Sequence, residues 1–235
     1  NFESFHYICY TLFILNLRGD CLSFYKKHES GFNLFLCWFL PALMLLLYYI
    51  MRGVYPFGNS TILTGDLGRQ YIDFFKYYKE TLLNDPSAFT YSFEKSLGGE
   101  MIGTWSYYLM SPFNLILLLF PERLFSVGIW LMVLLKVSLS SLSFGYLLTK
   151  KYKETNIGVV SFSISYALMS FVTANMLNII WLDALIWLPL IILGIDRIVN
   201  DKKPLLYIIS LAIMLVSNYY IGYMICIFAV MYFLY

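Results

Sequence analysis

The segment 52–123 carries acidic side chains whose type and position would allow acid–base chemistry. Asp66 begins an amphipathic stretch, and Arg69 follows three residues later. A carboxylate can act as the general base for an acceptor hydroxyl, and a guanidinium offers a fork of donors to a phosphate. In the structural alternative, Asp66 is the N-cap of a helix and the other charges form a solvated face.

A second carboxylate, Glu100, follows paired glycines in the stretch 96–103. Paired glycines predict either a tight backbone turn that approaches a ligand or an ordinary loop. They match neither a P-loop nor a dinucleotide fingerprint. Nucleotide binding is therefore not supported by this stretch.

A third carboxylate, Asp183, is predicted about one turn inside an apolar segment. A carboxylate in lipid is costly and should face protein or a water-filled cavity. Asp183 is thus part of a ligand site, the buried ion-pair partner of Lys136 in another apolar segment, or a residue that snorkels to the membrane surface. Nearby polar residues either line the same cavity or form turns: Asn178, Trp181, Asn218 and Tyr219.

The elements that position these residues follow from periodicity. From Asp66 to Leu82, apolar residues recur on one face of a helix and charged residues on the other. Such a helix is expected to lie on a membrane surface with its apolar side toward lipid. The apolar face comprises Leu67, Tyr71, Phe74, Phe75, Tyr78 and Leu82, and the polar face comprises Asp66, Arg69, Gln70, Asp73, Lys76 and Glu80.

The composition is that of an integral membrane protein. Hydrophobic residues make up 60% of the chain and charged residues only 13%, against about 25% charged in soluble domains. A spanning helix needs about 20 apolar residues. The sequence therefore predicts an all-α bundle of about five complete spans and a truncated sixth. The first four spans are predicted at 34–51, 124–149, 157–176 and 178–198. The fifth begins at 204, and a turn at 217–220 separates it from the sixth.

Basic residues in the short loops predict the orientation. Lys150, Lys151 and Lys153 separate the second and third spans, and Arg197 and neighbouring lysines separate the fourth and fifth. Such loops belong in the cytoplasm, which places the N-terminus inside and the segment 52–123 outside. The apolar stretch 105–120 would reverse this pattern if it crossed, so we expect it to be interfacial or re-entrant.

The remaining features set limits. The four cysteines lack CxxC spacing and the two histidines are isolated, so neither a disulfide framework nor a His-based zinc site is predicted. Residues 1–33 are expected to be a cytoplasmic or interfacial tail, or spurious sequence, and 34–235 the N-terminal part of a membrane domain. Because the chain ends within the apolar run 221–235, we expect it to be a fragment, inactive by itself, of a longer protein.

The chain carries, in order, the motifs YPFG at 55–58, DLGRQYIDFF at 66–75, LGGE at 97–100, YYLMSPFN at 107–114, NIIWLD at 178–183 and NYYIGY at 218–223. Together these motifs resemble the YfhO-type bacterial membrane proteins. That family is similar to the GT-C class of multi-span glycosyltransferases, which use a polyprenyl-phosphate-linked sugar as donor. The chain departs from family members in carrying Arg69 where they tend to have Gln.

The resemblance implies a multi-pass protein of the bacterial cell membrane with an extracytoplasmic active site. It implies Asp66 as the catalytic carboxylate, and lipoteichoic acid or a related envelope polymer of Gram-positive bacteria as acceptor. A divalent cation is used by some GT-C enzymes. The candidate substrate-binding residues are Arg69, Gln70, Tyr71, Asp73, Glu100, Asn178, Trp181, Asp183, Asn218 and Tyr219.

Two other functions remain open at this stage. A transporter or flippase of a lipid-linked substrate is expected to show internal repeats and polar residues near the middle of the membrane. The chain shows no repeat, and Lys136 is its central charge. A non-catalytic protein of envelope assembly would tolerate replacement of its carboxylates.

Overall fold

The computed structural model describes residues 30–235. Within them, three helices are long and apolar enough to cross a membrane: Ser30–Met51, Glu122–Tyr152 and Ile157–Asn175. The predicted tail 1–33 lies outside the described residues, except for 30–33, which belong to the first helix. The all-α membrane fold is confirmed.

The elements follow one another with short connections. The first helix leads into a long segment of short elements, which is followed by longer helices. The short elements are η1 (Leu67–Tyr71), α2 (Ile72–Leu83), η2 (Pro86–Phe89), β1 (Tyr91–Ser92), β2 (Gly99–Glu100), α3 (Ile102–Thr104), η3 (Trp105–Leu109), η4 (Pro112–Leu119) and η5 (Glu122–Leu124). The longer helices are α4 (Phe125–Tyr152), α5 (Ile157–Ala167), α6 (Ser170–Asn175), α7 (Leu182–Asp201), α8 (Leu205–Ser217) and α9 (Tyr219–Leu234).

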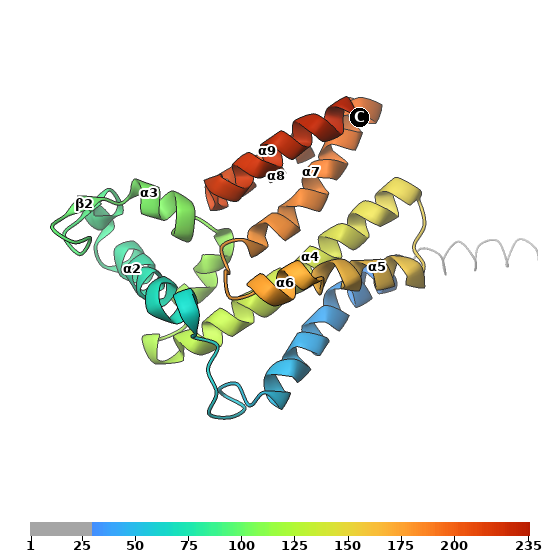
Figure 1. The fold of residues 1–235 in the computed structure, drawn as a ribbon. Helices are drawn as coiled ribbons and strands as arrows, with labels where there is room; N and C mark the ends of the chain where they lie inside the picture. The colour runs from blue at the N-terminus through green and yellow to red at the C-terminus, as the bar shows by residue number, and fades with distance from the viewer. Residues whose placement is uncertain (1–29) are drawn as a thin grey trace, which may run out of the picture.

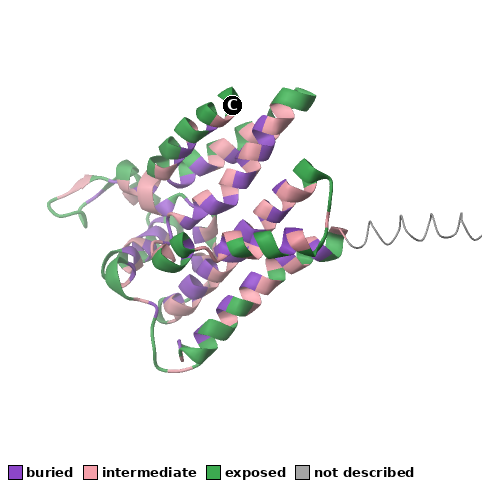
Figure 2. Cartoon of the chain, turned by 45° about the vertical axis from the view of Figure 1, so that its right-hand side comes forward, coloured by how far each residue is buried: buried purple, intermediate pink, exposed green. Residues whose placement is uncertain are grey.

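Helix α4 is the centre of the bundle. It packs against α5 and α7, and α7 packs in turn against α8 (Figure 1). Within an apolar stretch of 18 residues in each span, 61% of the residues are buried in the span that contains α4, against 22% in the first helix and 28% in α5–α6. The first helix and the C-terminal helix instead turn exposed residues outward (Figure 2). Their exposed apolar side chains are suited to contact lipid.

Several predicted spans differ in their ends. Helix α7 begins at Leu182 rather than 178, because Asn178 and Trp181 lie in turns, so Asp183 is the second residue of the helix. The third span divides into α5 and α6 around Leu168 and Met169. Helices α8 and α9 are shorter than a bilayer requires, at 13 and 16 residues. The predicted turn between them is confirmed at Asn218.

The stretch 105–120 is not one spanning helix. It divides at Met110 and Ser111 into a π-helical turn, η3, and a 3-10 helix, η4. Of the paired glycines, Gly98 closes a tight turn, with a φ of +103° and its backbone nitrogen donating to the carbonyl of Lys95 at 2.9 Å, whereas Gly99 begins β2. Around this turn β1 and β2 form an antiparallel hairpin that pairs Tyr91 with Glu100, which the sequence did not predict.

The amphipathic helix is confirmed, but the expected lipid contact of its apolar face is wrong. Leu67, Tyr71, Phe75 and Tyr78 are buried in the protein core, whereas Leu82 is exposed. The face packs on the stretch 105–120, as the 5.4 Å distance between the ring centroids of Tyr78 and Trp105 shows. The segment 52–123 is therefore a packed cap on one end of the bundle.

The contact between α7 and α8 gives a stability prediction. A Cβ added to Gly194 would lie 2.7 Å from the Cα and backbone nitrogen of Tyr207. These backbone atoms cannot move aside as the end of a flexible side chain could. Gly194→Ala should therefore destabilise the protein by about 1–3 kcal/mol, measured by thermal unfolding in detergent. Gly31→Ala is the matched control because nothing lies within 4 Å of its added Cβ. Equal stability of the two variants would contradict the close contact.

Candidate functional site

Asp66 is exposed at the beginning of the helical turns that follow the first span. It occupies the N-cap position of η1, but its side chain accepts no capping hydrogen bond. It also takes part in none of the ion pairs within residues 30–235. The Asp66 side chain therefore does not act as a helix cap, and the carboxylate is accessible to a ligand.

Beside Asp66 lies a cluster of four tyrosines, Tyr71, Tyr107, Tyr108 and Tyr219, here called the tyrosine cluster. The ring centroids are 5.5 Å apart between Tyr71 and Tyr108, 4.6 Å between Tyr107 and Tyr108, and 5.7 Å between Tyr107 and Tyr219. These residues come from η1, η3 and the start of α9. The cluster thus joins three segments that are distant in sequence.

The electrostatics of the cluster link it to Asp66. The pKa of Tyr71 is raised to about 12, mainly by burial and in smaller part by the neighbouring Tyr108 and the Asp66 carboxylate. Burial and Tyr107 also raise the pKa of Tyr108, although a hydrogen bond from Gln70 opposes this shift. Both phenols consequently keep their protons at neutral pH. They can donate hydrogen bonds to a ligand held beside Asp66.

Gln70 and Asn218 hold the cluster together. The Gln70 amide donates to the Tyr108 hydroxyl at 3.4 Å. Asn218 is fully buried, and its amide donates to the backbone carbonyl of Tyr107 at 3.0 Å. Its side-chain oxygen accepts from the backbone nitrogen of Ile221 at 2.9 Å and caps α9. Asn218 therefore forms the turn and also attaches it to η3.

This dual role predicts a stability loss on substitution. Asn218→Ala removes a helix cap and leaves the Tyr107 carbonyl without its donor, so we expect a loss of about 1–3 kcal/mol. Asn218→Asp retains the capping oxygen but lacks the donor, and it should fall between the wild type and the alanine variant. Thermal unfolding in detergent tests this order. An alanine variant as stable as the wild type would contradict it.

Asp183 and Lys136 form a fully buried ion pair. The Lys136 ammonium lies 2.6 Å from one Asp183 oxygen, and neither side chain is exposed. Ser111 donates to the other oxygen at 2.9 Å, and Lys136 donates to the Ile179 carbonyl at 3.0 Å. The ion-pair alternative for these two residues is confirmed. The pair connects α4, α7 and the break before η4.

Three other predicted residues have partners that do not belong to the tyrosine cluster. Asp73 and Lys76 form an exposed pair at 3.9 Å. The Glu100 carboxylate accepts from the backbone nitrogen of Gly103 at 3.2 Å. Asn178 donates to the Asn175 side chain at 3.5 Å. For these residues a substrate contact stays a prediction.

Two residues have less defined surroundings. Arg69 is exposed and forms none of the ion pairs found in residues 30–235. The Trp181 indole nitrogen is buried without a hydrogen-bond partner among the described residues.

Within residues 30–235, no group of three or more His, Cys, Asp or Glu side chains could hold a metal ion.

Sequence reasoning did not single out Tyr107, Tyr108 or Ser111 as site residues. All three belong to the YYLMSPFN motif at 107–114, which was recognised as a whole. Only Pro112 signalled the break that brings Ser111 to Asp183. The contacts of Tyr107 with α9 depend on tertiary packing, which no local pattern encodes.

Comparison with known proteins places the chain in a family. The family model described as bacterial membrane protein YfhO matches residues 37–235. The uncharacterized protein YfhO of Bacillus subtilis (strain 168) is 34% identical over 53 residues, which cover 23% of this chain and 6% of that protein. No solved structure matches. The chain therefore belongs to the YfhO family of bacterial membrane proteins.

Proposed function

We propose that the protein containing this chain is a membrane glycosyltransferase of the GT-C type. It would transfer a sugar from a polyprenyl-phosphate donor to an extracytoplasmic envelope acceptor such as lipoteichoic acid. The observation that carries the proposal is the exposed carboxylate of Asp66, which has no capping or ion-pair partner within residues 30–235 and lies beside the tyrosine cluster. Tyrosine offers a sugar both an apolar ring and a hydroxyl.

In the proposed reaction, the acceptor hydroxyl oxygen attacks the anomeric carbon of the donor sugar. Asp66 takes the hydroxyl proton as this bond forms. The bond between the anomeric carbon and the phosphate oxygen breaks, and the polyprenyl phosphate leaves with its electron pair. Tyr71 and Tyr108 would orient the sugar through their protonated hydroxyls.

The arrangement of the basic residues supports an extracytoplasmic site. Lys150, Lys151, Lys153 and Arg197 line one cavity between the end of α4 and the end of α7. Asp66 belongs to the cap at the opposite end of α4 (Figure 1). If the basic end is cytoplasmic, Asp66 faces outward.

Mass spectrometry of envelope polymers tests the proposal. The full-length protein and its Asp66→Asn variant would be expressed in a Gram-positive host that lacks the endogenous gene. Added hexose or N-acetylhexosamine that depends on Asp66 is the expected result. Equal decoration from both would make the carboxylate structural, and no decoration from either would favour a transporter or a non-catalytic assembly protein.

A further inference from the structure

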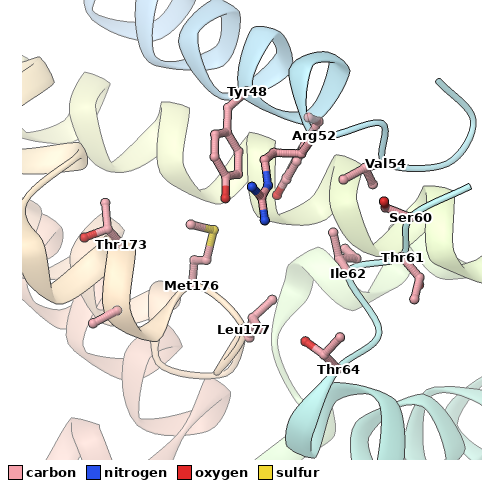
Figure 3. Close-up of a pocket in the computed structure, with 12 residues that line it drawn as sticks. Tyr48, Arg52, Val54, Ser60, Thr61, Ile62, Thr64, Thr173, Met176 and Leu177 are labelled. Carbon is pink, nitrogen blue, oxygen red and sulfur yellow. The ribbon is translucent and has the colours of Figure 1, made fainter. Parts of the chain in front are cut away.

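A cavity of about 370 Å³ lies where the first helix ends, and the proposed reaction does not use it. One wall is the last turn of the first helix, the second is the loop before Asp66, and the third is the end of α6 with the turn after it. Figure 3 shows the Arg52 guanidinium and the Tyr48 hydroxyl pointing into the space between these walls. The hydroxyl-bearing residues of the lining are Tyr48, Tyr49, Ser60, Thr61, Thr64 and Thr173.

The backbone fixes the position of Arg52. Gly53 has a φ of +60° and ends the first helix. The nitrogen of Val54 donates to the carbonyl of Tyr49 at 3.0 Å, and that of Gly53 to the carbonyl of Ile50 at 3.0 Å. These two bonds form a Schellman motif. Arg52, which directly follows the last helical residue, is thereby held in place with its side chain at the cavity.

The YPFG motif then returns the chain to Arg52. Tyr55 donates from its backbone nitrogen to the carbonyl of Ser60 at 2.8 Å, and Ser60 donates to the carbonyl of Gly53 at 2.9 Å. Val54 and Ser60 accordingly form an isolated bridge. This closed loop brings Ser60 and Thr61 to the cavity. The motif, which the proposed function leaves unexplained, thus shapes the second wall.

The charge of the cavity selects an anion. Among the described residues, Arg52 is the one charged residue of the lining, and no carboxylate takes part in it. Arg52 also appears in none of the ion pairs within residues 30–235. Thr61 accepts from the backbone nitrogen of Leu63 at 3.1 Å, which leaves its own proton available. A guanidinium surrounded by hydroxyl donors is the chemistry that recognises a phosphate.

The position of the cavity selects a lipid as the carrier of that phosphate. Arg52 directly follows the last residue of a membrane span. The final turns of that span expose large apolar side chains, Leu47, Ile50 and Met51. Acyl chains can pack along this face while a headgroup reaches the cavity at the end of the helix.

We propose that this cavity binds the phosphate group of a membrane lipid, with Arg52 as the charged partner and the Tyr48 hydroxyl as a further donor. The inference stands on the cavity itself and does not depend on the glycosyltransferase proposal. It assigns the end of the first helix as a lipid-headgroup site.

Native mass spectrometry of the full-length protein in detergent tests the site. The protein would be titrated with phosphatidylglycerol, with phosphatidylcholine, and with inorganic phosphate. Arg52→Gln should weaken binding of phosphatidylglycerol by about 10- to 100-fold, since it removes a charge-assisted hydrogen bond. Arg52→Lys keeps the charge but lacks the planar fork, and its affinity should fall between those of the wild type and Arg52→Gln.

Two further variants separate a loss of the site from a loss of the fold. Tyr48→Phe removes only a hydroxyl and should weaken phosphatidylglycerol binding without a change in unfolding temperature. Arg123→Gln removes an exposed arginine of the same cap, away from the cavity, and should bind like the wild type. Equal phosphatidylglycerol binding by wild type and Arg52→Gln would overturn the proposal. Arg52-dependent binding of inorganic phosphate alone would overturn the assignment to a lipid.

Discussion

Asp66→Asn is expected to lower sugar transfer by the full-length protein by about 10²- to 10⁴-fold, which is the usual contribution of a general base. The amide retains the size of the side chain but cannot take the proton of the acceptor hydroxyl. Because Asp66 is exposed and makes no capping hydrogen bond, its loss should change stability by no more than about 0.5 kcal/mol. Mass spectrometry of lipoteichoic acid gives the activity, and thermal unfolding gives the stability.

Glu94→Gln is the matched control for this experiment. Glu94 is an exposed carboxylate of the same cap and forms none of the ion pairs within residues 30–235. This substitution removes the same charge from the cap but should leave transfer unchanged. A similar fall in both variants would point to the overall charge of the cap. Retained transfer in Asp66→Asn would remove Asp66 from the catalytic role.

The helices of this chain could be predicted because their signals are local. Periodicity placed the apolar face of the amphipathic helix on Leu67, Tyr71 and Phe75, which are buried. The polar cluster at Asn218 correctly predicted the end of α8. What covers the amphipathic helix could not be predicted, because lipid and the aromatic stretch 105–120 satisfy the same apolar face equally well.

The candidate site was predicted only in part for a related reason. Asp66, Gln70 and Tyr71 lie on one continuous stretch, so their proximity follows from the sequence. Tyr107 and Tyr219 meet because η3 breaks and α9 begins at the same end of the bundle. That contact depends on how α8 packs on α7, and no spacing in the sequence reports it.

Breaking the buried ion pair is expected to give the largest stability loss in the described bundle. Lys136→Met leaves the Asp183 carboxylate buried without its cation, and Asp183→Leu leaves the ammonium without its anion. Each single variant should lose about 3–5 kcal/mol, because an uncompensated charge in the interior is costly. Denaturant unfolding of the full-length protein in detergent measures both losses.

The double variant Lys136→Met with Asp183→Leu separates a structural role of the pair from a functional one. It leaves no buried charge, so most of the lost stability should return. The remaining loss of stability would come from the Ser111 hydroxyl and the Ile179 carbonyl, which no longer have their hydrogen bonds to the pair. A double variant as unstable as the single ones would contradict this account of the pair. A stable double variant that still transfers sugar would assign the pair a structural role only. A stable double variant that has lost transfer would give Asp183 a role in the reaction in addition to its pairing with Lys136.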